Sequence, residues 1–130
     1  MYEFIIIIII HWIADFVFQD EEWALNKNKS IDALLNHTIM YSLVWMFYLS
    51  LAYFPFNVGK EGFLNICVFV LITFIFYTIT DYFTSKKVSK KFANKEYGSP
   101  IPNFGVFTLI GFDQVLHYIQ LILTWNFIFN

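Results

Sequence analysis

The stretch FLNICVFVLITFIFYTITDYF, residues 63–83, decides the fold class. It is predominantly apolar, and its length matches the roughly 20 residues that an α-helix needs to cross a bilayer. A lone β-strand would leave its backbone groups without partners in lipid, whereas a helix pairs them internally. Residues 63–83 therefore predict a transmembrane helix.

The composition of the whole chain agrees with a membrane protein. Of its 130 residues, 58% are hydrophobic, 22% are aromatic and only 14% are charged, against about 25% charged in a typical soluble domain. A soluble chain of this size would expose a large surface to water, and it has too few charged residues to cover that surface. The net charge of -2 and the absence of arginine oppose nucleic-acid binding. The single Cys67 excludes a disulfide scaffold.

Three further segments are apolar enough to cross a bilayer. The expected fold is all-α, a single transmembrane domain over residues 1–130 that forms an integral membrane bundle of four transmembrane helices. The spans are expected at about residues 4–19, 31–53, 63–83 and 104–129. Pro55 ends the second span, and Pro100 and Pro102 precede the fourth. The first span is short, and a half-helix that does not cross is the alternative. It lacks the basic start of a signal peptide, so we expect it in the mature protein.

The lysines predict the orientation of the bundle. Loops 20–30 and 84–103 contain all lysines except Lys60, which lies in the loop between the second and third spans. The positive-inside rule then places loops 20–30 and 84–103 in the cytoplasm and both termini outside. We expect the inner (cytoplasmic) membrane of a bacterium, with the lipid bilayer as partner, and we interpret the loop lysines as topology signals.

All three histidines and three aspartates lie within the predicted spans: His11, His37, His117, Asp15, Asp81 and Asp113. Ionisable groups at these depths are costly and usually face the bundle interior or a wet cavity. The pairs His11–Asp15 and Asp113–His117 are each spaced by four residues, so each pair shares one helix face. Gln19 follows Asp15 at the same spacing, and Tyr77 precedes Asp81. Most of these residues fall in the cytoplasmic half of the bilayer, which predicts one shared site.

The charge of this site points to a cation. Three ionised carboxylates would repel one another in a low-dielectric setting. Because no lysine lies within a span, we expect protons, protonated histidines or a bound cation to compensate them. Mixed imidazole and carboxylate ligands suit zinc, manganese or ferrous iron better than calcium. The candidate metal ligands are His11, Asp15, His37, Asp81, Asp113 and His117. The alternative interpretation is that these residues are contacts between helices.

Four stretches of the chain resemble an uncharacterised family of small polytopic membrane proteins of bacteria and phages, a domain of unknown function. They are HWIADFVFQ (11–19), NKNKSIDALLNHTIMY (26–41), TDYFTSKKVS (80–89) and IGFDQVLHYIQLILT (110–124). The shared motifs are H-x-x-x-D-F-x-x-Q and D-Q-x-x-H. The resemblance implies that Gln19 and Gln114 also belong to the site. A histidine often stands in this family where the chain has Tyr77, which could hydrogen-bond a neighbouring ligand.

The leading hypothesis is a membrane-embedded, metal-dependent hydrolase with a lipid or lipid-linked substrate. A more distant similarity to bacterial inner-membrane proteins described as metal-dependent hydrolases favours it. Asp15, Asp81 and Asp113 would perform the chemistry, and Gln19, Tyr77 and Gln114 would orient ligands or substrate. One alternative is a non-enzymatic ion- or proton-binding transport module, in a homo-oligomer. Another is a structural or phage-encoded membrane protein. The sequence leaves the reaction, the substrate and the metal open.

Overall fold

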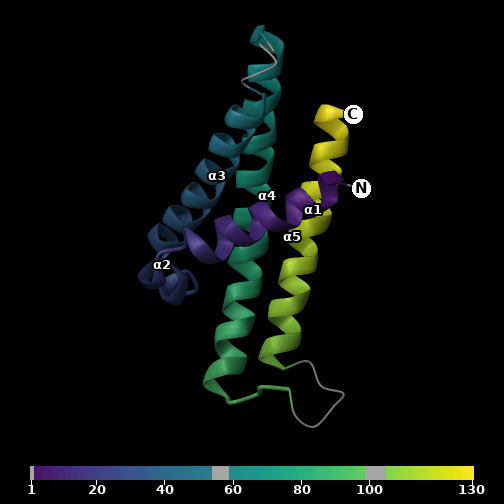
Figure 1. The fold of residues 1–130 in the computed structure, drawn as a ribbon. Helices are drawn as coiled ribbons and strands as arrows, with labels where there is room; N and C mark the ends of the chain where they lie inside the picture. The colour runs from purple at the N-terminus through teal and green to yellow at the C-terminus, as the bar shows by residue number, and fades with distance from the viewer. Residues whose placement is uncertain (1, 54–58, 99–104) are drawn as a thin grey trace.

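All regular structure in the described part of the chain is helical. The computed structural model describes residues 2–53, 59–98 and 105–130. The elements in chain order are α1 (Tyr2–Trp12), the π-helix η1 (Ile13–Val17), α2 (Glu21–Asn26), α3 (Ile31–Tyr53), α4 (Gly59–Ala93) and α5 (Val106–Phe129) (Figure 1). The predicted all-α class is confirmed. The boundaries expected at Pro55, Pro100, Pro102 and Phe104 lie outside the described residues.

Three helices of the described chain, not four, are long and apolar enough to cross a membrane, namely α3, α4 and α5. The prediction of a fourth span at residues 4–19 is wrong. The 11 residues of α1 and the 5 residues of η1 extend about 24 Å at about 1.5 Å per residue, less than the roughly 30 Å of a hydrocarbon core. The short alternative considered for this segment agrees better with the structure.

The first helix lies across the other three instead of beside them. α4 packs between α3 and α5, and the α1–η1 segment contacts both α5 and α3. Figure 1 shows α1 running at a steep angle to α4 and α5. Ile7 and His11 are buried on its packed face, whereas Ile5, Ile8 and Ile9 remain exposed. This crossing carries the segment that contains His11 to the polar faces of the long helices.

The segment between η1 and α3 folds back against the bundle. Asp20 caps α2, because its carboxylate accepts hydrogen bonds from the backbone N–H groups of Glu22 and Trp23. α2 packs against α3, and Asn28 Nδ2 donates to Ser89 Oγ of α4 at 2.7 Å. The segment therefore lies beside the C-terminal part of α4.

The helix α4 continues past Phe83 to Ala93, so the connecting segment expected at 84–103 begins inside a helix. Residues 84–93 contain neither glycine nor proline, and lysine, which is frequent here, is a good helix former. The added turns extend α4 beyond the apolar run that predicted it.

An aromatic core holds the three long helices together on one side of the polar residues. The Phe69 ring of α4 lies 5.4 Å from the Trp45 ring of α3 and 6.0 Å from the Trp125 ring of α5, between centroids. All three are buried, and tilted or edge-on aromatic pairs add to the stabilisation from burial. The polar layer lies about two helical turns away from this core on each helix, at His37, Tyr77 and His117.

Candidate functional site

The six side chains expected to bind a metal gather in one place. Each exposes 9% of its surface or less. They are His11 of α1, Asp15 of η1, His37 of α3, Asp81 of α4, and Asp113 and His117 of α5. We call these six residues the His/Asp cluster. Residues four apart on a helix share a face, which is why His11 and Asp15, and likewise Asp113 and His117, reach the cluster together.

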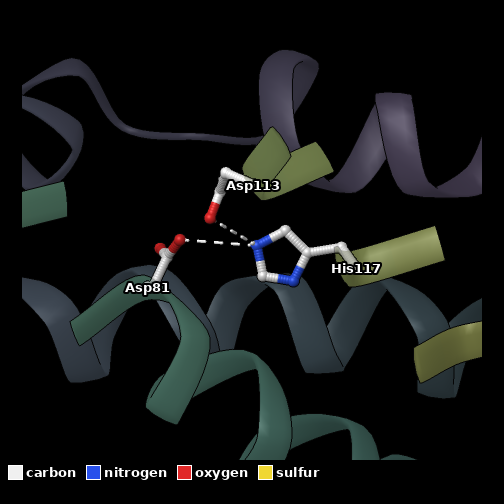
Figure 2. Close-up of side chains that lie close together, drawn as sticks. All are labelled: Asp81, Asp113 and His117. Atoms are coloured by element: carbon white, nitrogen blue, oxygen red, sulfur yellow. Dashed lines mark ion pairs between the residues drawn. The ribbon is translucent and has the colours of Figure 1, made fainter. Parts of the chain in front are cut away.

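Asp81, Asp113 and His117 form the part of the cluster best suited to a metal (Figure 2). His117 Nε2 lies 3.5 Å from Asp81 Oδ1 and 3.4 Å from Asp113 Oδ1. One ligand atom from each residue lies within 4.8 Å of the other two. Nε2 of His117 is buried and makes no hydrogen bond with the described residues, which is unusual for a buried polar atom. The three donors fit a divalent transition metal.

Asp15 is held by two hydrogen bonds beside this triad. The Tyr77 hydroxyl donates to Asp15 Oδ1 at 2.5 Å, and Gln114 Nε2 donates to Asp15 Oδ2 at 3.1 Å. His37 Nε2 lies 3.4 Å from Asp15 Oδ1 and 3.3 Å from Asp81 Oδ2. An imidazole thus stands between two carboxylates, where it can exchange a proton with either.

Both ring nitrogens of His11 are engaged by neighbours. His11 Nε2 lies 2.8 Å from Gln114 Oε1, and because an amide oxygen only accepts, Nε2 carries the proton. His11 Nδ1 lies 2.7 Å from the Tyr41 hydroxyl and accepts from it. Asp15 Oδ2 is further away, at 4.0 Å from Nε2. In this geometry His11 orients Gln114, which in turn holds Asp15.

Lys27 is a site residue that the sequence did not reveal. Its Nζ donates to Asp81 Oδ2 at 2.8 Å. Burial lowers the pKa of the Lys27 ammonium, but the carboxylates of Asp81 and Asp15 outweigh burial and raise that pKa, so the side chain stays charged. The expectation that no lysine compensates the carboxylates is therefore wrong. Lys27 reaches the site because segment 20–30 folds back against the bundle. In the sequence, only its place in the NKNKS stretch pointed to Lys27.

Three other polar residues support the cluster. Thr84 Oγ1 donates to Asp113 Oδ1 at 2.6 Å, and it belongs to the polar face of α4 that its spacing of three residues from Asp81 indicates. The Tyr77 ring stacks on the His117 ring, with 4.0 Å between centroids. Gln19 lines a cavity of about 360 Å³ beside the cluster. That cavity lies between η1, the α2 segment and the facing parts of α4 and α5, and all three aspartates of the cluster line it.

The fold and the site define a small helical protein of the membrane type, with a buried His/Asp centre beside a cavity. Residues 4–130 match the family described as "Protein of unknown function (DUF3307)", and the chain belongs to this family. The resemblance to a family of unknown function is thus confirmed at this level. No curated protein and no solved structure matches the chain. The function has to be argued from the geometry.

Proposed function

We propose that the chain is a membrane-embedded, metal-dependent hydrolase that acts on a lipid or a lipid-linked substrate. One observation carries the proposal. The donors of Asp81, Asp113 and His117 converge on one buried point, where His117 Nε2 has no hydrogen-bond partner among the described residues. A cavity adjoins that point. This donor set favours zinc, manganese or ferrous iron.

The charge of the site supports a divalent ion. Asp15, Asp81 and Asp113 are buried, and Lys27 forms an ion pair with Asp81. Three carboxylates and one ammonium leave two negative charges, which one divalent cation cancels if the histidines are neutral. Without the cation, protonated histidines must provide the balance, because unpaired buried charges are strongly destabilising.

Each residue of the His/Asp cluster near the cavity has a proposed role in hydrolysis. Asp81, Asp113 and His117 would hold the metal, which when bound lowers the pKa of a coordinated water and makes it a nucleophile. Asp15 lines the cavity and would accept a proton from water there. His37, between Asp15 and Asp81, would pass that proton onward.

We place the cavity on the cytoplasmic side of a bacterial inner membrane. The hydrogen bond between Asn28 and Ser89 joins segment 20–30 to the C-terminal part of α4, so the two lysine-rich regions lie together. The positive-inside rule assigns such regions to the cytoplasm. With three crossing helices, the C-terminus then lies outside. The outside placement of the N-terminus assumed a fourth span and is withdrawn.

Elemental analysis of the detergent-purified protein tests the metal centre. We expect near-stoichiometric zinc, manganese or iron in the parent protein and its loss in Asp113→Asn and His117→Gln. Asp32→Asn is the matched control, because Asp32 is exposed on α3, and this variant should keep the metal. A parent protein that is folded by circular dichroism yet binds none of these metals would refute the metal centre.

Lipid turnover tests the reaction. The metal-loaded protein is incubated with a bacterial lipid extract in isotopically labelled water, and mass spectrometry detects products that carry the label. Asp15→Asn should retain the metal but lose turnover, because Asp15 is placed outside the proposed ligand set. Labelled products formed equally by the parent and Asp15→Asn would exclude the assigned role of Asp15. Products from neither, with metal bound, would exclude hydrolysis of these lipids.

A proton relay is the second candidate, and a continuous chain of polar contacts favours it. This chain alternates carboxylate and imidazole, with 3.3–3.5 Å between each carboxylate oxygen and the neighbouring Nε2, and it runs through Asp15, His37, Asp81, His117 and Asp113. Such a chain can conduct protons without a metal. Proton flux into liposomes by metal-free protein, abolished in Asp15→Asn, would establish this alternative in place of the hydrolase.

A further inference from the structure

The cavity beside the His/Asp cluster has two kinds of wall. Its volume is about 360 Å³. The aspartates of the cluster form one part of the wall, whereas large apolar side chains form another, namely Phe16, Leu25, Phe92 and Ile110. A wholly polar ligand would leave the apolar wall unmatched, and a wholly apolar ligand would leave the carboxylates unpaired. The cavity therefore suits an amphiphile.

The position of the cavity along α4 indicates where the polar end of that amphiphile lies. The apolar run of α4 ends at Phe83, and the lysines begin at Lys86. Ser85 and Ser89 follow Asp81 at spacings of four residues, so all three share one helix face, and all three line the cavity. The cavity thus crosses the boundary between apolar and basic helix, which corresponds to the headgroup level of a bilayer.

The Ser85 hydroxyl lacks a partner at this boundary. Its Oγ is buried and makes no hydrogen bond within the described residues. The neighbouring hydroxyls are occupied, because Ser89 Oγ accepts from Asn28 and Thr84 Oγ1 donates to Asp113. A buried hydroxyl is costly when unpaired. An acceptor oxygen of a ligand in the cavity would satisfy Ser85.

The lysines of α4 next to the serine end of the cavity favour an anionic headgroup, once the aspartates of the other wall are neutralised. Lys86, Lys87 and Lys90 are exposed on the same turns of α4 that carry the cavity serines. Neither these lysines nor the exposed Glu21 and Glu22 of α2 line the cavity, but the lysines lie on the same helix as Ser85 and Ser89. Lysines at headgroup level attract anionic lipids. Phosphate oxygens accept strongly from ammonium and hydroxyl donors and also bind divalent metals.

We propose that the cavity binds an anionic, phosphate-bearing lipid, whose phosphate accepts a hydrogen bond from Ser85 and whose chain lies against the apolar wall. This rests on the proposed function, because it names the substrate class of that site. Binding itself does not require the reaction, and it requires only that the aspartates are neutralised, either by the metal or by protonated histidines. The lipid headgroup would lie next to the aspartates, within reach of the metal that they are proposed to hold.

Native mass spectrometry of the detergent-solubilised full chain tests the proposal. The protein is titrated with phosphatidylglycerol and, separately, with phosphatidylcholine of the same chains. We expect about tenfold tighter binding of phosphatidylglycerol, from lysines near the headgroup. Replacement of Lys86, Lys87 and Lys90 by glutamine should abolish this preference. Lys60→Gln, at the opposite end of α4, is the matched control and should keep it.

The hydroxyl has its own pair of variants. Ser85→Val should weaken binding of both lipids at least about tenfold, as expected for the loss of one hydrogen bond to a charged acceptor. Ser50→Val, on the exposed surface of α3, should change nothing. If Ser85→Val does not fold, the three surface lysine substitutions still decide the proposal.

Several results would overturn this lipid site. The first is equal affinity of the parent protein for phosphatidylglycerol and phosphatidylcholine. The second is an unchanged lipid affinity in a folded Ser85→Val variant. The third is a preference for phosphatidylglycerol that remains after the three lysines are replaced. Glycerol 3-phosphate tests whether a soluble phosphate can replace the lipid. If it binds as tightly as phosphatidylglycerol, the cavity is not a lipid site. Titrations with and without a chelator separate the two proposals. A failed metal centre leaves the lipid preference intact, and a failed lipid site leaves the elemental analysis unchanged.

Discussion

Replacement of Lys27 by methionine tests whether this ammonium is the built-in counter-charge of the site. Methionine keeps an unbranched apolar stem and removes the charge. Lys27 Nζ lies 2.8 Å from Asp81 Oδ2, and the Asp81 side chain is only 1% exposed. Water in the cavity that Asp81 lines can replace only part of this partner, because the carboxylate is almost fully enclosed by the bundle. We expect the metal-free variant to be markedly less stable than the parent.

The size of the loss follows from the geometry. At the 2.8 Å separation and an effective dielectric constant of about 20, two unit charges attract by about 6 kcal/mol. Part of the lost attraction is offset, because the variant no longer has to desolvate a charged lysine. Removing one partner of a buried ion pair therefore lowers the free energy of unfolding by about 3–5 kcal/mol. Lys27 keeps 19% of its side chain exposed, so we expect the lower end, about 3 kcal/mol. For a chain of this size that lowers Tm by about 10 °C.

Thermal unfolding followed by circular dichroism in detergent, with chelator present, measures this loss. Lys29→Met is the control, because Lys29 is exposed two residues along the chain. In the double variant Lys27→Met, Asp81→Asn the carboxylate charge is also gone, so the two losses should not add. Excess zinc should narrow the gap between parent and Lys27→Met. A loss no larger than that of Lys29→Met would refute the counter-charge argument.

The pH dependence of the same gap provides a second test. The pKa of Lys27 is raised in the folded state by the carboxylates of Asp81 and Asp15. Such a group contributes its full stability below the unfolded lysine pKa, about 10.4, and loses it as the pH rises through the higher folded value. The gap between parent and Lys27→Met should therefore be constant from neutral pH to about pH 10 and then close. A gap that persists after the lysine is deprotonated would show that charge is not its cause.

Three further predictions concern single contacts. Tyr77→Phe removes the hydroxyl that donates to Asp15 but keeps the ring, so denaturant unfolding should show a loss of about 2 kcal/mol; no loss would contradict the contact. Asp20→Ala removes the cap of α2 and should cost about 1 kcal/mol, with faster hydrogen exchange confined to residues 20–30. Glu96→Gln breaks an exposed ion pair with Lys91 and should leave Tm unchanged, because such pairs contribute little.

Part of the candidate site follows from local periodicity. His11 with Asp15, and Asp113 with His117, are spaced so that each pair shares a helix face, and the structure brings both pairs together. The cost of ionisable groups in an apolar helix predicts that they face inward, and His37 does so. These inferences need only one helix at a time, which explains why a single sequence was sufficient for them.

The remaining features depend on contacts between distant segments. Lys27 and Asp81 are 54 residues apart, and their pairing requires the fold-back of segment 20–30, which no local pattern reveals. The first helix was misjudged for a related reason. Hydropathy detects the run of isoleucines but not the direction of the helix that contains them. In the structure this helix buries Ile7 and leaves Ile8 and Ile9 exposed. A crossing helix and a spanning helix can have equally apolar sequences.

The crossing of α1 explains how a segment too short to span still contributes to the site. Because α4 separates α3 from α5, these three helices form a layer whose polar residues need a cover on one side. α1 crosses α5, and η1 continues to α3 (Figure 1). The hydrogen bond from Phe18 N–H to Ile13 O, at 3.0 Å, closes a π-helical turn that contains Asp15. Single π-helical turns are frequent at functional sites. His11 thereby reaches Tyr41 while Asp15 reaches Tyr77. The non-spanning helix thus closes the cluster on the side that the three long helices leave open.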